Sequence, residues 1–344
     1  MSEFKQWVIY FFGKYFLKYV VATPSTHPKK IRLFSIFDLT AILGVGLSFW
    51  LRYVRILGAF LKQQRKLDTW SSISDIYPRG LMILYYFLLF TWAKFNNILK
   101  TIIAAPQGCL LGELFIRYIC EMDVQIDRVD GSLELSRSPF FPKRSGRSQE
   151  FLREFLVILQ QVNISRTARQ RLLREFQIYR QSYLLVSQLN AQQPKIDSPL
   201  EEVLVDKSKV AGQLWGTWAM ILSLAYSLPE AQIQESNQLL HDFGMVTQVF
   251  DDMADVPHDL EECQPNILYA ICRQHPAELR LLDAHLRQHG GRFLNLEWAK
   301  ANLPLSTSTS KDLARQYLDR AIALDREGHV TEDMTKCFTA LSLI

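Results

Sequence analysis

The chain has 344 residues, of which 48% are hydrophobic and 22% are charged. This composition is typical of a globular protein and excludes an intrinsically disordered one. The formal net charge is only +4, and no long run of lysine and arginine occurs, which disfavours nucleic acid as a partner. The five cysteines are scattered without a CxxC pattern. We therefore expect reduced thiols and a cytoplasmic protein, not a zinc site.

Residues 1–105 are richer in aromatic and basic side chains than the rest of the chain. The apolar segment 7–21 contains two lysines and is followed by no small-residue cleavage site, so we expect no signal peptide. The apolar runs 39–51 and 80–93 are shorter than the roughly 20 residues that span a bilayer. We expect an N-terminal helical region that packs on the remaining chain. Peripheral membrane contact and homodimerisation are alternatives for its apolar surfaces.

After this region, apolar residues recur with the 3.6-residue period of an α-helix. No alternating pattern flanked by hairpin signals indicates a strand. Ser148 and Ser198-Pro199 precede glutamates and are plausible helix starts. We therefore predict an all-α fold, a large helical bundle of residues 106–344 around a central apolar cavity. The predicted helices cover 107–130, 149–164, 166–190, 201–228, 230–256, 263–289 and 311–325, with a break at 303–311.

The predicted helix 107–130 ends in a pair of carboxylates. Asp123 and Asp127 are four residues apart in ICEMDVQIDRVDGS, so they share a helical face. Asp130 lies one turn further, and Gly131 is a helix-stop signal. Alone, this pattern has little specificity, because two aspartates at that spacing occur by chance in many helices.

The predicted helix 230–256 ends in a denser cluster. Asp251, Asp252, Asp255 and Asp259 fall within nine residues, directly after an apolar run. Like charges at i and i+4 repel, so the helix gains no stability from this arrangement. Mg²⁺ removes the repulsion, since it binds carboxylate oxygens together with substrate phosphates. We interpret the cluster as a metal site, against the alternative of a solvated acidic face.

The two clusters lie 128 residues apart in the sequence, between Asp123 and Asp251. With four or five helices between them, the two helices can face each other across a bundle with their carboxylates at one end. Such an arrangement can hold two or three Mg²⁺ ions and a diphosphate leaving group. The remaining allylic cation needs a dry, aromatic-lined cavity. Trp215 and Trp218 are candidates for that lining, with ordinary core packing as the alternative.

The segment FGMVTQVFDDMAD followed by VPHD resembles the second aspartate-rich motif of the trans-isoprenyl diphosphate synthases. That motif is a DDxxD element preceded by a glutamine three positions earlier. Gln248, Asp251, Asp252, Asp255 and Asp259 all fall on it. The resemblance is good over about 205–270 and looser from about 107 to the C-terminus. It implies the isoprenoid synthase fold, Mg²⁺ dependence and a prenyl diphosphate substrate, with Asp123, Asp127, Asp251, Asp252 and Asp255 as metal-binding and catalytic residues and Gln248 in contact with substrate.

The segment VDKSKVAGQLWGTWAMILSLAYSL resembles the family's helix whose lysine reaches the diphosphate. Lys209 is our first choice for that lysine, and Lys207 is the alternative. Arg128 and Arg137 are the nearest basic residues to the first carboxylate pair and are further candidates for phosphate binding. The basic segment 137–147 is expected to be either an exposed loop or a lid over the diphosphate.

The sequence also departs from the family's pattern. Its first motif reads DVQID, without the paired arginines that normally follow, and the N-terminal element that binds isopentenyl diphosphate is not recognisable. These departures disfavour chain elongation. Our leading hypothesis is a class I terpene synthase-like enzyme that ionises one prenyl diphosphate and cyclises or rearranges it. The alternatives are prenyl transfer to another acceptor and a non-catalytic partner subunit of a prenyl synthase.

Overall fold

The computed structural model describes residues 88–89, 92–93, 95–98, 101–102, 105, 107–129, 148–192, 195–289 and 294–325. For residues 120–121, 123–129, 148–149, 188–192 and 289, it describes the backbone but not the side chains. The predicted N-terminal region 1–105 therefore lies almost entirely outside the described residues.

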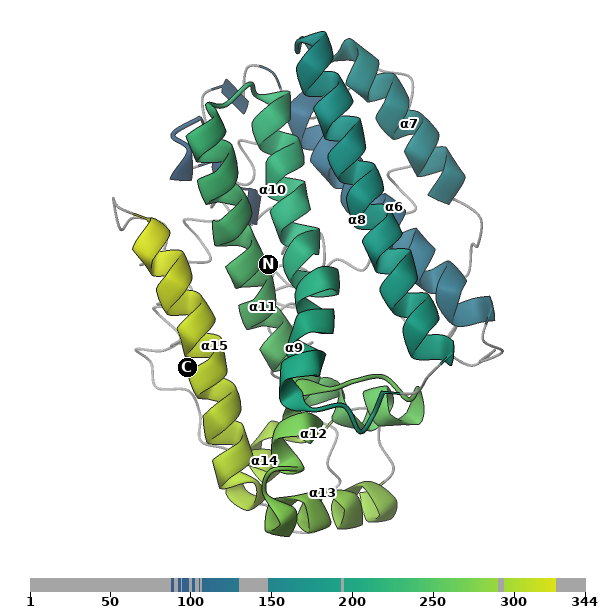
Figure 1. Ribbon diagram of the computed structural model, residues 1–344, viewed down its shortest axis with the longest axis vertical. Helices are drawn as coiled ribbons and strands as arrows, with labels where there is room; N and C mark the ends of the chain where they lie inside the picture. The colour runs from purple at the N-terminus through teal and green to yellow at the C-terminus, as the bar shows by residue number, and fades with distance from the viewer. Residues whose placement is uncertain are drawn as a thin grey trace, which may run out of the picture.

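Every regular element in the described ranges is a helix (Figure 1), so the all-α prediction is confirmed. One short segment, η3, is a π-helix; the others are α-helices. No described helix has a stretch that is both long enough and apolar enough to cross a membrane. The helices are α6 (Gln107–Val129), α7 (Ser148–Gln161), α8 (Arg166–Gln192), α9 (Leu200–Lys207), η3 (Ser208–Gly212), α10 (Gln213–Ala225), α11 (Glu230–Glu261), α12 (Ile267–Cys272), α13 (Pro276–His289), α14 (Leu296–Asn302) and α15 (Pro304–Leu324).

Helix α10 packs closely against α6 because glycines let the two backbones approach. A Cβ added to Gly108 would lie 2.6 Å from the ring of Tyr226, just beyond the end of α10. A Cβ added to Gly112, one turn later, would lie 2.7 Å from Nε1 of Trp218 and 2.9 Å from Leu222. The order of these contacts shows that α6 runs antiparallel to α10.

Helix α11 also runs antiparallel to α10. Gly216 lies against Asn237, and Gly244 lies against Trp215, so positions later in α11 meet positions earlier in α10. Both α6 and α11 therefore start near the C-terminal end of α10 and run toward α9 (Figure 1). The carboxylate-bearing halves of α6 and α11 point to the same end of the bundle.

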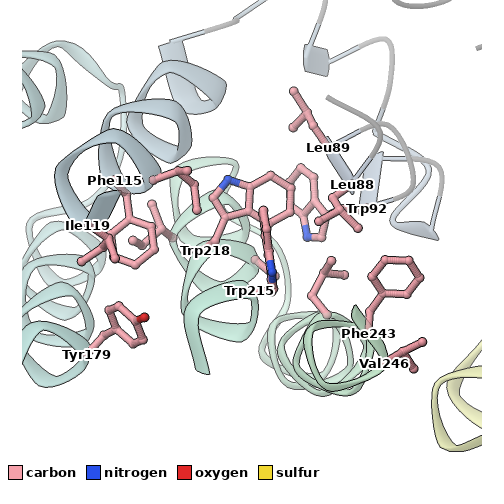
Figure 2. Close-up of a cluster of buried hydrophobic side chains, with 14 of the residues drawn as sticks. Leu88, Leu89, Trp92, Phe115, Ile119, Tyr179, Trp215, Trp218, Phe243 and Val246 are labelled. Atoms are coloured by element: carbon pink, nitrogen blue, oxygen red, sulfur yellow. The ribbon is translucent and has the colours of Figure 1, made fainter. Parts of the chain in front are cut away.

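Aromatic side chains fill the interior between these helices (Figure 2). The ring centroid of Trp218 lies 5.9 Å from that of Trp215 and 6.5 Å from that of Trp92, both in edge-on contacts. Phe115 of α6 meets Tyr179 of α8 at 5.5 Å. Trp215 and Trp218 are both buried, so ordinary core packing, the alternative that we considered for the two tryptophans, describes their surroundings in the structure.

Two predicted boundaries after α11 are wrong. The helix was expected to end at 256 but continues through Pro257 to Glu261, and it stops where Cys263 adopts a left-handed φ of 57°. The next helix was expected from 263 but begins at Ile267, where the Asn266 side chain accepts a hydrogen bond from Tyr269 N. Local capping determines both positions.

The predicted break at 303–311 is also wrong, because α15 begins at Pro304. Proline is well suited to the first turn of a helix. The buried carboxylate of Glu278 accepts hydrogen bonds from the backbone N–H groups of Leu305 and Ser306, both at 2.8 Å. A contact from α13 thus stabilises a helix start whose Ser and Thr residues are, by sequence, typical of a loop.

Candidate functional site

The buried carboxylate of Asp252 is at the centre of the predicted site on α11. Its side chain is 1% exposed. Its Oδ1 accepts hydrogen bonds from Lys207 Nζ at 2.9 Å and from Gln248 Nε2 at 2.5 Å. Its Oδ2 accepts one from the backbone N–H of Ile267 at 2.8 Å. Asp252 therefore ties α11 both to the end of α9 and to the start of α12.

Lys207 is the cation of this cluster. Its Nζ lies 2.9 Å from Asp252 Oδ1 and 3.9 Å from Asp259 Oδ2, and its side chain is 15% exposed. Burial alone would lower the pKa of Lys207, but the charges of Asp252 and Asp259 outweigh burial and raise it above its ordinary value. Lys207 is thus held in its charged form.

Asp259 shares the lysine with Asp252. Its Oδ2 accepts a hydrogen bond from Asn266 Nδ2 at 2.7 Å. Burial raises the pKa of Asp259 to about 7; Lys207 opposes this rise and the charge of Asp252 adds to it. Burial also raises the pKa of Asp252, and the charge of Lys207 opposes that rise, so the two carboxyls titrate as a pair around one lysine.

Asp251 and Asp255 lie beside this buried cluster and are half-buried. They are four residues apart on α11 and share a face. The charge of Asp251 acts on both Lys207 and Asp259. Within the described ranges, no three His, Cys, Asp or Glu side chains are grouped so as to hold a metal ion.

The three predicted metal ligands on α11 have different surroundings. Both oxygens of Asp252 already accept hydrogen bonds from the protein, so Asp252 is suited to organising the site. Asp251 and Asp255 are the α11 carboxylates suited to bind a cation, since they reach the surface. The metal-binding roles of Asp251, Asp252 and Asp255 stay predictions.

The first carboxylate pair and its neighbouring arginine lie in the last two turns of α6, where the structure describes the backbone. Asp123 and Asp127 are thus on a helix that runs toward the same end as the second half of α11. Arg128 follows them in the same helix. Arg137 and the basic segment 137–147 lie outside the described residues.

The two candidate lysines have different surroundings. Lys209 is 47% exposed, and its Nζ lies 3.8 Å from Asp206 Oδ1. Lys207 is the one that contacts the α11 carboxylates. The π-turn η3 begins directly after Lys207, and which of the two lysines reaches a diphosphate stays a prediction.

Sequence reasoning missed Asn266 as part of the cluster. Its buried amide donates hydrogen bonds to the backbone oxygen of Asp252 at 2.8 Å and to the carboxylate of Asp259. Its Oδ1 also caps α12. The signal was present, since an asparagine directly before an apolar run is typical of a helix N-cap.

Comparisons with the models of known protein families, with curated proteins and with solved structures find no match to this chain. Its function is therefore inferred from its own residues. A partly exposed carboxylate pair next to a buried ammonium group can bind a divalent cation together with a phosphate-containing ligand.

Proposed function

We propose that the protein is a Mg²⁺-dependent class I terpene synthase-like enzyme that ionises a prenyl diphosphate and cyclises or rearranges the allylic cation. One observation carries this proposal. Asp251 and Asp255 are half-buried and share a face of α11, where like charges repel. Two carboxylates at this spacing repel each other, and a divalent cation bound between them would relieve that repulsion.

The directions of the helices support the proposal. The C-terminal half of α6, with Asp123 and Asp127, and that of α11 point to the same end of the bundle (Figure 1). Asp251 and Asp255 would hold Mg²⁺ on α11, and the α6 pair would hold it on the other side. When bound, Mg²⁺ neutralises the diphosphate and assists its departure as a Lewis acid.

The chain's own residues would bind and orient the substrate. Lys207 contacts the α11 carboxylates, and Lys209 lies two residues further and is more exposed; both ammonium groups are suited to phosphate oxygens. The negative charge of Asp252 keeps Lys207 in place between substrates. Buried aromatic rings, including Trp215 and Trp218, exclude water from the interior of the bundle.

Release of inorganic pyrophosphate tests this proposal. We expect the purified protein with Mg²⁺ to release it from geranyl, farnesyl or geranylgeranyl diphosphate without a second substrate, and the products to include hydrocarbons. A protein that releases pyrophosphate only after isopentenyl diphosphate is added would be a prenyltransferase. Absence of release from all three substrates, with or without an acceptor, would contradict the enzymatic proposal and favour a partner subunit.

A further inference from the structure

The π-helical turn η3 is supported by side chains from two neighbouring helices. The hydroxyl of Tyr179, on α8, donates a hydrogen bond to the carbonyl oxygen of Val210 at 2.9 Å. On the α11 side, Ser208 Oγ lies 2.9 Å from Nε2 of His241. A π-turn inserts one residue into an α-helix and occurs frequently at functional sites. Here Val210 of the π-turn is bonded by Tyr179, and Ser208 is paired with His241.

The orientation of His241 is determined by a second set of contacts. Its Nδ1 lies 3.3 Å from Oδ1 of Asp242, whose side chain is fully buried. Arg320 of α15 donates to the same carboxylate at 2.9 Å. We assign the ring proton to Nδ1, which donates to Asp242, so Nε2 accepts from the Ser208 hydroxyl. The chain of contacts thus runs from α15 through α11 to the π-turn.

The π-turn has a direct effect on the direction of Lys207. In a regular α-helix, residues five apart point roughly 140° away from each other. Lys207 and Gly212 are five apart, yet both face α11. Lys207 bonds to Asp252, and a Cβ added to Gly212 would lie 2.6 Å from Nε2 of His241. The inserted residue brings both positions onto the same side.

We propose that Tyr179, Ser208 and His241 are positioning residues that hold the π-turn and thereby aim Lys207 at Asp252. If the turn relaxed to a regular α-helix, Lys207 would rotate away by about 100°. Asp252 would then be a buried carboxyl without a nearby ammonium group, which is unfavourable. The role of this positioning in diphosphate binding rests on the proposed function, whereas the positioning of Lys207 does not.

Acetylation of lysines in the full-length protein tests the proposal without any substrate. N-hydroxysuccinimidyl acetate modifies accessible amines, and mass spectrometry reports each site separately. Lys209 is an internal reference two residues away, because it is 47% exposed whereas Lys207 is 15% exposed and paired. In the protein of wild-type sequence, Lys207 should react with the reagent at least about tenfold more slowly than Lys209, since a buried and paired amine is protected.

The variant Tyr179→Phe with Ser208→Ala removes both hydroxyls from the π-turn. We expect the ratio of Lys207 to Lys209 acetylation to rise by about tenfold, as befits the loss of two hydrogen bonds. Tyr179→Phe with Ser208→Thr, which retains one hydroxyl, should restore part of the protection. Ser187→Ala removes a comparable half-buried hydroxyl that bonds within α8, and it should leave the ratio unchanged.

Two results would overturn the proposal. One is equal reactivity of Lys207 and Lys209 toward the reagent in the protein of wild-type sequence. The other is unchanged protection of Lys207 in the double variant. If the double variant unfolds, acetylation also rises at Lys195. The single variant Tyr179→Phe then serves as the test. A ratio of Lys207 to Lys209 acetylation equal to that of the wild-type sequence would refute the proposal. None of these results depends on whether the protein turns over a prenyl diphosphate.

Discussion

Lys207 Nζ and Asp252 Oδ1 lie 2.9 Å apart, although 45 residues separate them in the sequence. Because Oδ2 of the same aspartate accepts from the backbone N–H of Ile267, one carboxylate joins α9, α11 and α12. This pair thus links the lysine-bearing helix to the aspartate-rich helix. The buried Lys207 and Asp252 organise the cluster, whereas Asp251 and Asp255 are partly exposed.

Replacing Lys207 should destabilise the fold. Lys207→Ala leaves Asp252 buried without its cation, and we expect a loss of about 3 kcal/mol in the free energy of unfolding. Lys209→Ala, two residues away and largely exposed, should cost less than about 0.5 kcal/mol. Urea denaturation of the two variants measures the difference. Equal losses in the free energy of unfolding would mean that the buried ion pair contributes no more to stability than an exposed lysine does.

Stability should depend on pH through Asp259. Its pKa is raised from 3.8 to about 7 by burial, so between these values the folded protein binds more protons than the unfolded chain. The contribution of Asp259 to the free energy of unfolding is therefore largest at low pH. It is lost as the pH rises toward 7, at up to about 1.4 kcal/mol per pH unit. Asp259→Asn should flatten the unfolding profile in this window. A profile identical to that of the unmodified protein would contradict the assignment.

The two kinds of aspartate on α11 should respond differently to neutralisation. Asp252→Asn removes the partner of a buried lysine and should cost about 3 kcal/mol. Asp251→Asn and Asp255→Asn should change stability by no more than about 0.5 kcal/mol, because they relieve repulsion at a partly exposed face. Thermal and urea unfolding of the three variants test this division. A large loss at Asp251 or Asp255 would assign them a structural role.

The close contact between α6 and α10 should be sensitive to one added methyl group. A Cβ on Gly112 would lie 2.7 Å from the fully buried Trp218, and we expect Gly112→Ala to destabilise the protein by about 2 kcal/mol through overpacking. Gly216→Ala is a matched control, since its nearest contact would be 3.2 Å. Its loss should be smaller, as measured by urea denaturation. A loss at Gly112 no larger than that at Gly216 would contradict the expected overpacking between α6 and α10.

The sequence was sufficient to predict the helical class and several helices, including α6, α7 and α8, to within three residues. Periodicity and simple capping signals determine these elements locally. The start of α15 could not be predicted, because it depends on Glu278 from another helix. A local pattern contains no information about such a contact.

The candidate site was predictable in part for the same reason. The spacing of the aspartates identified the relevant end of α11, but not which carboxylates are buried. The contact between Lys207 and Asp252 was not predicted, because the π-turn changes the direction of the helix face at that point. That turn depends on Tyr179 and His241, whose contacts with it are long-range. Only the tertiary structure brings them together.

The most direct test of the proposed site is calorimetric titration of inorganic pyrophosphate into the purified full-length protein, with and without Mg²⁺. We predict binding that requires Mg²⁺, that is abolished in Asp251→Asn with Asp255→Asn, and that is retained in Asp319→Asn, which changes an exposed aspartate on α15. The double variant should remain folded, so its loss of binding would report the site itself. Binding that persists in the double variant, or no binding by the unmodified protein, would contradict the account.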